Sequence, residues 1–148
     1  MIIFVNVILS EIFELGKDFI WERPDKCPRC NHHKVWMHGF VQALFDGFDA
    51  PLQLKRYRCP CCGCVITLRP DTHFSRFQAS KETIRSSLSC RINTGQWPPG
   101  LSKSRMRYWL NNLKKKTAAY LTNSWDKGIM AAFDNFIKNG QVPVSSTI

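Results

Sequence analysis

Two Cys-Pro-x-Cys motifs place the strongest constraint on how this 148-residue chain folds. The first is CPRC at 27–30, and the second is CPCC at 59–62. Each motif is a turn that presents two sulfurs on one side, and four thiolates from two such turns satisfy the tetrahedral preference of Zn²⁺. Gly63 follows the second pair, where a backbone with positive φ directs amide groups at sulfur. One closed, structural zinc site is therefore predicted, with the ligands Cys27, Cys30, Cys59 and Cys62.

The other cysteines leave alternatives open. The downstream cluster also contains Cys61 and Cys64 as a pair in a shifted register, and four thiolates also suit an iron–sulfur cluster. We favour zinc in the first register, because only that register repeats Cys-Pro-x-Cys and precedes a glycine. His32 and His33 are expected to be exposed polar residues, since four thiols suffice for the metal. The seventh cysteine, Cys90, is expected in a helix, and an odd count argues against disulfides and favours a reducing, intracellular compartment.

The first half of the chain has the pattern of a small sheet. Residues 34–58 predict a β-hairpin around the turn cluster 46–51, and VITLRP at 65–70 predicts a third strand. Both cysteine motifs then lie at one end of an antiparallel zinc ribbon. Residues 1–21 are apolar and are compatible with a buried strand and a short helix after Ser10, although periodicity does not decide so short a run. Their acidic residues and the lack of a basic leader indicate neither a signal peptide nor a membrane span.

The second half changes from a period of two to a helical period of about 3.6. A helix is predicted over 80–93 with Ser80 as N-cap, a second after Ser102, and a third from about Ser124 to Asn139. The predicted fold class is α+β, a zinc ribbon followed by about three helices that resemble a helix-turn-helix. The predicted domains are 1–24, an apolar segment that packs on the core, 25–75, the ribbon, and 76–148, the basic helical part.

Charge is distributed unevenly along the chain. Residues 1–24 carry net −2, 25–75 carry +3 and 76–148 carry +9, which favours an anionic partner, most often nucleic acid. The predicted helix from Lys103 to Leu121 contains no acid, has an apolar stripe, and presents polar and basic residues on its other side. An ordinary exposed face would mix both signs. The predicted nucleic-acid contacts are Lys103, Ser104, Arg107, Asn111, Lys114, Lys115 and Lys116.

Three segments, CPRCNHHKVWMHGF, LKRYRCPCCGCVITLRP and GLSKSRMRYWL, resemble the short zinc-ribbon/helix-turn-helix proteins of bacterial transposons and insertion sequences. The resemblance covers residues 22 to about 113, although the connection from Thr94 to Leu101 is longer than the turn of about 3–4 residues in a simple helix-turn-helix. It implies sequence-directed DNA binding, the four zinc ligands named above, and a bacterial cytoplasmic, nucleoid-associated location. Because the chain lacks the acidic core of a transposase, it also implies an accessory or targeting factor whose transposase is encoded separately.

The expected function is therefore that of a non-catalytic, zinc-dependent nucleic-acid-binding protein, with DNA favoured over RNA. A transcriptional regulator would share these features. The main alternative is a protein–protein interaction subunit of a larger complex, in which the apolar N-terminus and the aromatic hairpin bury against a partner. An enzyme is disfavoured, because no nucleophile–base pair, paired carboxylates or phosphate-binding glycine loop stands out.

Overall fold

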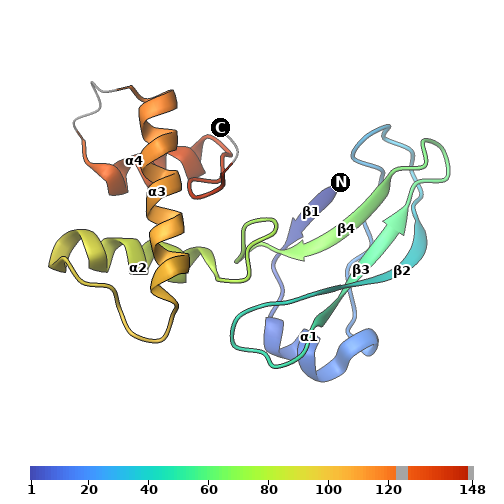
Figure 1. Cartoon of the computed structure of the whole chain (residues 1–148). Coiled ribbons are helices and arrows are strands. Elements are labelled where there is room, and N and C mark those ends of the chain that lie inside the picture. Colours follow the sequence, from blue (N-terminus) through green and yellow to red (C-terminus); the bar gives the residue numbers. More distant parts are fainter. Residues whose placement is uncertain (123–126, 147–148) are drawn as a thin grey trace. The chain divides into compact units, whose positions relative to one another are not determined.

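The structure is a computed structural model that describes residues 1–122 and 127–146. The chain divides into two compact units, Met1–Ser80 and Lys81–Ile148. The first unit contains a four-stranded mixed sheet with two short helices, and the second contains three α-helices (Figure 1). The fold is thus α+β, as the change of hydrophobic period indicates.

The predicted hairpin and third strand are confirmed. Strands β2 (Trp36–Ala43) and β3 (Leu52–Arg58) pair antiparallel, and β4 (Val65–Pro70) pairs antiparallel with β3. The loop before β2 and the loop between β3 and β4 carry the two cysteine motifs, and both lie at the same end of the sheet (Figure 1). Two sequence-distant loops are therefore brought together by strand pairing alone.

The first strand corrects the prediction of a three-stranded antiparallel ribbon. Strand β1 (Ile2–Val5) joins the sheet parallel to β4, which gives the order β1-β4-β3-β2. The terminal ammonium of Met1 donates to the Val65 carbonyl at 3.0 Å, and the Thr67 N–H donates to the Met1 carbonyl at 2.9 Å. The segment satisfies the backbone groups of β4 that a three-stranded ribbon would leave open.

The core of the first unit forms between the sheet and the segment that follows β1. Helix α1 (Leu9–Leu15) begins one residue before Ser10 and buries Ile12 completely, and a 3₁₀ turn η1 (Gly16–Asp18) leads to the buried Trp21. Both side chains belong to one apolar cluster with the sheet and with three of the cysteines. The cluster comprises Ile12, Trp21, Cys27, Val35, Phe45, Leu52, Leu54, Tyr57, Cys59, Cys64, Ile66 and Leu68.

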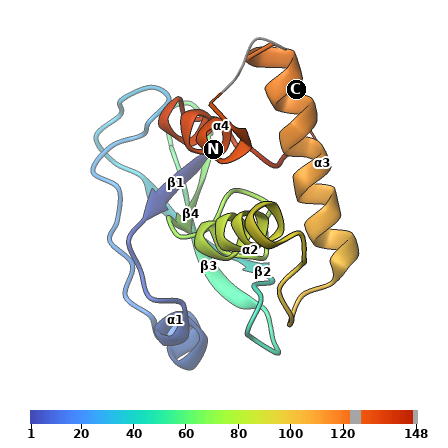
Figure 2. The same cartoon turned by 90° about the vertical axis from the view of Figure 1, so that its left-hand side faces the viewer.

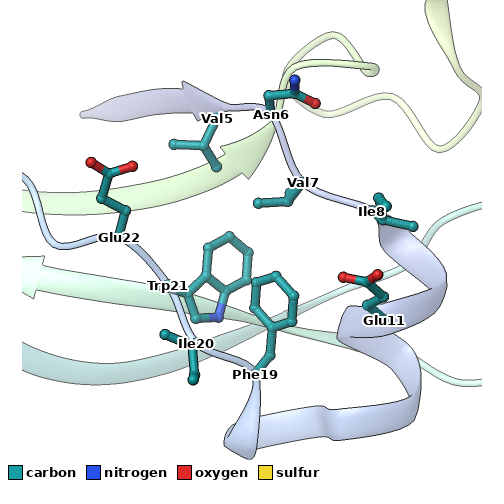
Figure 3. A pocket seen from close by; sticks show the side chains of 9 residues that line it. All are labelled: Val5, Asn6, Val7, Ile8, Glu11, Phe19, Ile20, Trp21 and Glu22. Carbon is teal, nitrogen blue, oxygen red and sulfur yellow. The ribbon is translucent and has the colours of Figure 1, made fainter.

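A pocket of about 450 Å³ lies beside α1. Figure 3 shows the rings of Phe19 and Trp21 next to each other, with Val7 pointing toward them and the side chains of Glu11 and Glu22 also bordering the opening. Two carboxylates at an apolar opening disfavour an anionic ligand. This pocket is therefore not a candidate site for nucleic acid.

The helical unit consists of α2 (Lys81–Thr94), α3 (Lys103–Tyr120) and α4 (Ile129–Lys138), which contact one another pairwise (Figure 2). The first two match the predicted helices closely. The third begins at Ile129 after Gly128, whose φ is 92°, rather than at about Ser124, and residues 123–126 lie outside the described part. The apolar core of the helical unit is formed by Ile84, Leu88, Met106, Trp109, Leu113, Ala132, Phe133, Phe136 and Val144.

Polar contacts hold the helices and the C-terminal tail together. Arg85 on α2 donates from Nε and Nη2 to the two carboxylate oxygens of Asp134 on α4, each at 2.9 Å. The Asn112 side chain of α3 donates to the Val144 carbonyl at 3.1 Å. The tail therefore lies against α3.

Among the helices in the described residues, none has both the length and the apolar composition needed to span a membrane.

Candidate metal centre and basic helix

The sulfurs of the two cysteine motifs converge on one point. The Sγ atoms of Cys27, Cys30, Cys59 and Cys62 all lie within 4.8 Å of one another. The Cys27–Cys62 pair is 3.7 Å apart and the Cys30–Cys59 pair 3.5 Å. Those sulfur–sulfur distances are too long for disulfide bonds, in which the S–S bond length is about 2.05 Å. They match the edge of about 3.8 Å expected for a tetrahedron of sulfurs about 2.3 Å from a central Zn²⁺. The cluster is consistent with one structural metal site.

The two motifs adopt the same backbone conformation. In each, the N–H of the first cysteine donates to the carbonyl five residues on, from Cys27 to His32 at 2.9 Å and from Cys59 to Cys64 at 3.0 Å. The N–H four residues on donates back to the first cysteine's carbonyl, from Asn31 at 2.9 Å and from Gly63 at 3.0 Å. Two matching turns from distant parts of the chain thus present their sulfurs to a shared centre.

The residue after each pair has positive φ. Gly63 has a φ of 75°, as the sequence predicts, and Asn31 occupies the equivalent position with a φ of 62°. Asparagine tolerates this left-handed region better than other residues with a side chain. The role of Asn31 was missed in the sequence, although its position directly after CPRC corresponds to that of glycine after CPCC.

This equivalence gives a matched pair of variants. Gly63→Ala is expected to lower the free energy of unfolding of the metal-loaded protein by about 1–2 kcal/mol, because alanine must adopt the left-handed region. The cost is conformational, since an added Cβ would meet only the Arg58 side chain, at 3.8 Å. Asn31→Gly should leave the stability nearly unchanged. Denaturant unfolding checks both, and equal losses from the two variants would contradict the assigned conformations.

Backbone amides favour the thiolate form at the first cysteine of each motif. Burial raises the pKa of the Cys27 thiol, but the backbone N–H groups of Cys30 and Arg29 and the Cys62 thiol lower it to about 6. The Arg29 N–H lies 3.4 Å from the Cys27 sulfur. The pKa of Cys59 is lowered too, against its burial, by the equivalent amides of its own turn. A divalent cation would replace the protons that these sulfurs otherwise share.

The remaining candidate ligands lie outside the cluster. Cys61 is exposed, and the thiol of the buried Cys64 donates to the Val65 carbonyl at 3.7 Å. His32 and His33 are exposed, and Cys90 lies on α2. The register that uses Cys61 and Cys64 is therefore not the one that the fold brings together.

Helix α3 buries one side as predicted, although the polar Asn112 and Lys116 are buried with it and Tyr120 is exposed. Met106, Trp109 and Leu113 are buried. Six of the seven predicted nucleic-acid contacts are exposed on the other side: Lys103, Ser104, Arg107, Asn111, Lys114 and Lys115. No acidic residue lies on this helix. The exposed face therefore carries cations and neutral residues but no acid.

Lys116 differs from the other predicted contacts. Its side chain is 5% exposed, and its ammonium donates to the Val142 carbonyl at 2.6 Å and to the Ser145 hydroxyl at 2.7 Å. Burial lowers the pKa of this ammonium. The C-terminal tail covers the position, so Lys116 holds the tail against α3 and does not face solvent.

The fold and the cluster define a small α+β protein with a four-cysteine candidate metal site on a mixed sheet. Comparison with protein families, with curated proteins and with solved structures finds no match to this chain. The resemblance to transposon-encoded ribbon proteins therefore stays a prediction, and only the residues of this chain indicate its function.

Proposed function

We propose that the protein is a non-catalytic, zinc-dependent DNA-binding protein that contacts the duplex through α3. The observation that carries the proposal is the exposed, acid-free cationic face of this helix. Surface helices that face only solvent usually mix charges of both signs, because opposite charges one turn apart stabilise the helix. A face that has cations but no acids lacks that stabilisation and is suited to binding a polyanion.

The residue types on this face suit both positioning and readout. Lys103, Lys114 and Lys115 present ammonium groups that pair with phosphates, whereas Arg107 and Asn111 can form bidentate contacts with guanine and adenine edges. The major groove is about 12 Å wide, which admits a helix about 10–12 Å in diameter. The opposite face of α3 is fixed by its buried core, so the cationic face is presented without rearrangement.

Zinc has a structural role in this proposal. A site with four thiolates is closed and leaves no position for a reactive water. Its binding energy instead stabilises a unit that ends at Ser80 and is small for one apolar core. An accessory role beside a separately encoded transposase, or a role in transcriptional regulation, would use the same surface.

A salt titration tests the proposal. If the four exposed cations of α3 each neutralise one phosphate, the logarithm of the association constant for duplex DNA should fall with the logarithm of salt concentration at a slope of about −3.6 or steeper. Fluorescence anisotropy of the zinc-loaded full chain with a labelled duplex measures this slope. A binding constant that does not change with salt would contradict the proposal and favour a protein partner.

A further inference from the structure

One face of the sheet carries a group of arginines. No aspartate or glutamate occurs in any of the four strands. Cross-strand register places Arg58 between Trp36 and Val65, and Arg56 beside Thr67. Since directly paired residues share a face of the sheet, these side chains lie on one surface. We call it the arginine face, and its members are Ile2, Phe4, Trp36, Arg56, Arg58, Val65, Thr67 and Arg69.

The opposite face of the sheet is covered by the chain itself. Phe40 and Tyr57 belong to that other face, by register and by alternation with the arginines of β3. The Lys17 ammonium lies 5.8 Å from the Phe40 ring, and the Arg23 guanidinium lies 5.7 Å from the Tyr57 ring. Residues 17–23 therefore contact part of that side. On β3 itself Leu52 and Leu54 alternate with the same parity as Arg56 and Arg58 but are buried in the core, so the exposed part of the arginine face is the end that carries Trp36 and Arg58.

The three arginines are positioned but not neutralised. None of them forms an ion pair in the part of the chain that the structure describes. The Nε atoms of Arg56 and Arg69 are buried without a hydrogen-bond acceptor, and the Arg69 guanidinium lies 5.5 Å from the Phe45 ring. The sheet holds the inner parts of these arginine side chains in place. Binding of an anion to the outer guanidinium nitrogens therefore costs little additional side-chain entropy.

An aromatic ring stands beside these charges. Trp36 is 62% exposed although the preceding residue, Val35, is 1% exposed, and it lies directly opposite Arg58. Phe4 is 45% exposed and lies opposite Arg69 at the other edge of the sheet. Exposed aromatic rings next to cations on a sheet provide base stacking and phosphate contacts together.

We propose that the arginine face binds a segment of single-stranded nucleic acid, with a base stacked on Trp36 and phosphates paired with Arg56, Arg58 and Arg69. Stacking on Trp36 requires an unpaired base, whereas a duplex would use the arginines and leave the ring without a partner. The proposal goes beyond duplex binding by α3. It adds a second surface, which lies on the metal-bearing unit.

The matched variants are Trp36→Ala and Met37→Ala. The two residues are neighbours on β2 with similar exposures, 62% and 63%, but register places Met37 on the face opposite Trp36. The probe is a labelled oligothymidine of about 12 nucleotides, within the site sizes of small β-domains. We expect Trp36→Ala to weaken its binding to the zinc-loaded full chain by roughly tenfold, and Met37→Ala to leave it unchanged.

Further variants separate this surface from α3. Arg58→Gln should reduce the salt slope for the single strand by about 0.7, while Arg107→Gln should affect only the duplex. Zinc content and circular dichroism should be those of the unaltered protein for each variant. Equal losses from Trp36→Ala and Met37→Ala, absence of single-strand binding, or equally tight binding of polyglutamate would each overturn the proposal. None of these results bears on duplex binding by α3, so the two proposals fail separately.

Discussion

Replacing Cys59 with serine should abolish stoichiometric zinc binding and unfold the unit Met1–Ser80. Cys59 is completely buried, and its sulfur lies 3.5 Å from that of Cys30, so its loss removes one ligand from the centre of the cluster. Structural zinc contributes about 10–16 kcal/mol in small zinc-binding domains. That is comparable to the whole stability of a typical domain, about 5–15 kcal/mol. Zinc content of the purified protein and its near-ultraviolet circular dichroism measure the outcome, and chelation of the unaltered chain should reproduce it.

Cys61→Ser is the matched control. Cys61 lies in the same turn, one residue before the ligand Cys62, but its exposed sulfur is not part of the cluster. The control should bind one zinc per chain and keep its fold. Loss of zinc from Cys61→Ser with retention in Cys59→Ser would contradict the assigned ligand set. Visible absorption from the purified protein would instead indicate an iron–sulfur cluster.

The sequence contains most of the information that defines the metal site. Two CxxC motifs and one glycine are local patterns whose chemistry is the same in any fold, and strand pairing then brings them together. Asn31 was missed because asparagine follows many turns without adopting positive φ. Its role appears only when its backbone is compared with that of Gly63.

Elements that depend on distant partners could not be predicted in the same way. Ile2–Val5 is too short for periodicity to specify its neighbour, and the structure pairs it in parallel with β4, about sixty residues away. Lys116 was predicted to contact nucleic acid as part of the run from Lys114 to Lys116, but its contacts with Val142 and Ser145 come from the C-terminal tail. Alternation groups Arg56 and Arg58 with Leu52 and Leu54, yet the two leucines are buried in the core, so alternation alone cannot tell the exposed end of this face from the buried one.

Neutralising three cations of α3 should weaken duplex binding on the order of 100-fold near 0.15 M salt. The variant Arg107→Gln/Lys114→Gln/Lys115→Gln removes three exposed charges while the buried residues of the helix are unchanged. If each charge releases one phosphate counterion, the salt slope should fall by about 2.7. Anisotropy titrations at several salt concentrations give both values. The unfolding free energy should change little, since exposed positions contribute little to stability.

Lys116→Met tests whether position on the helix, rather than lysine content, determines binding. This lysine is next to Lys115 in sequence, but its ammonium is buried against the tail. Its replacement should lower the free energy of unfolding by about 1–3 kcal/mol, because the Val142 carbonyl loses its donor. The salt slope should stay that of the unaltered protein. A slope lowered as much by Lys116→Met as by Lys115→Gln would show that net charge, not the exposed face of α3, attracts the DNA.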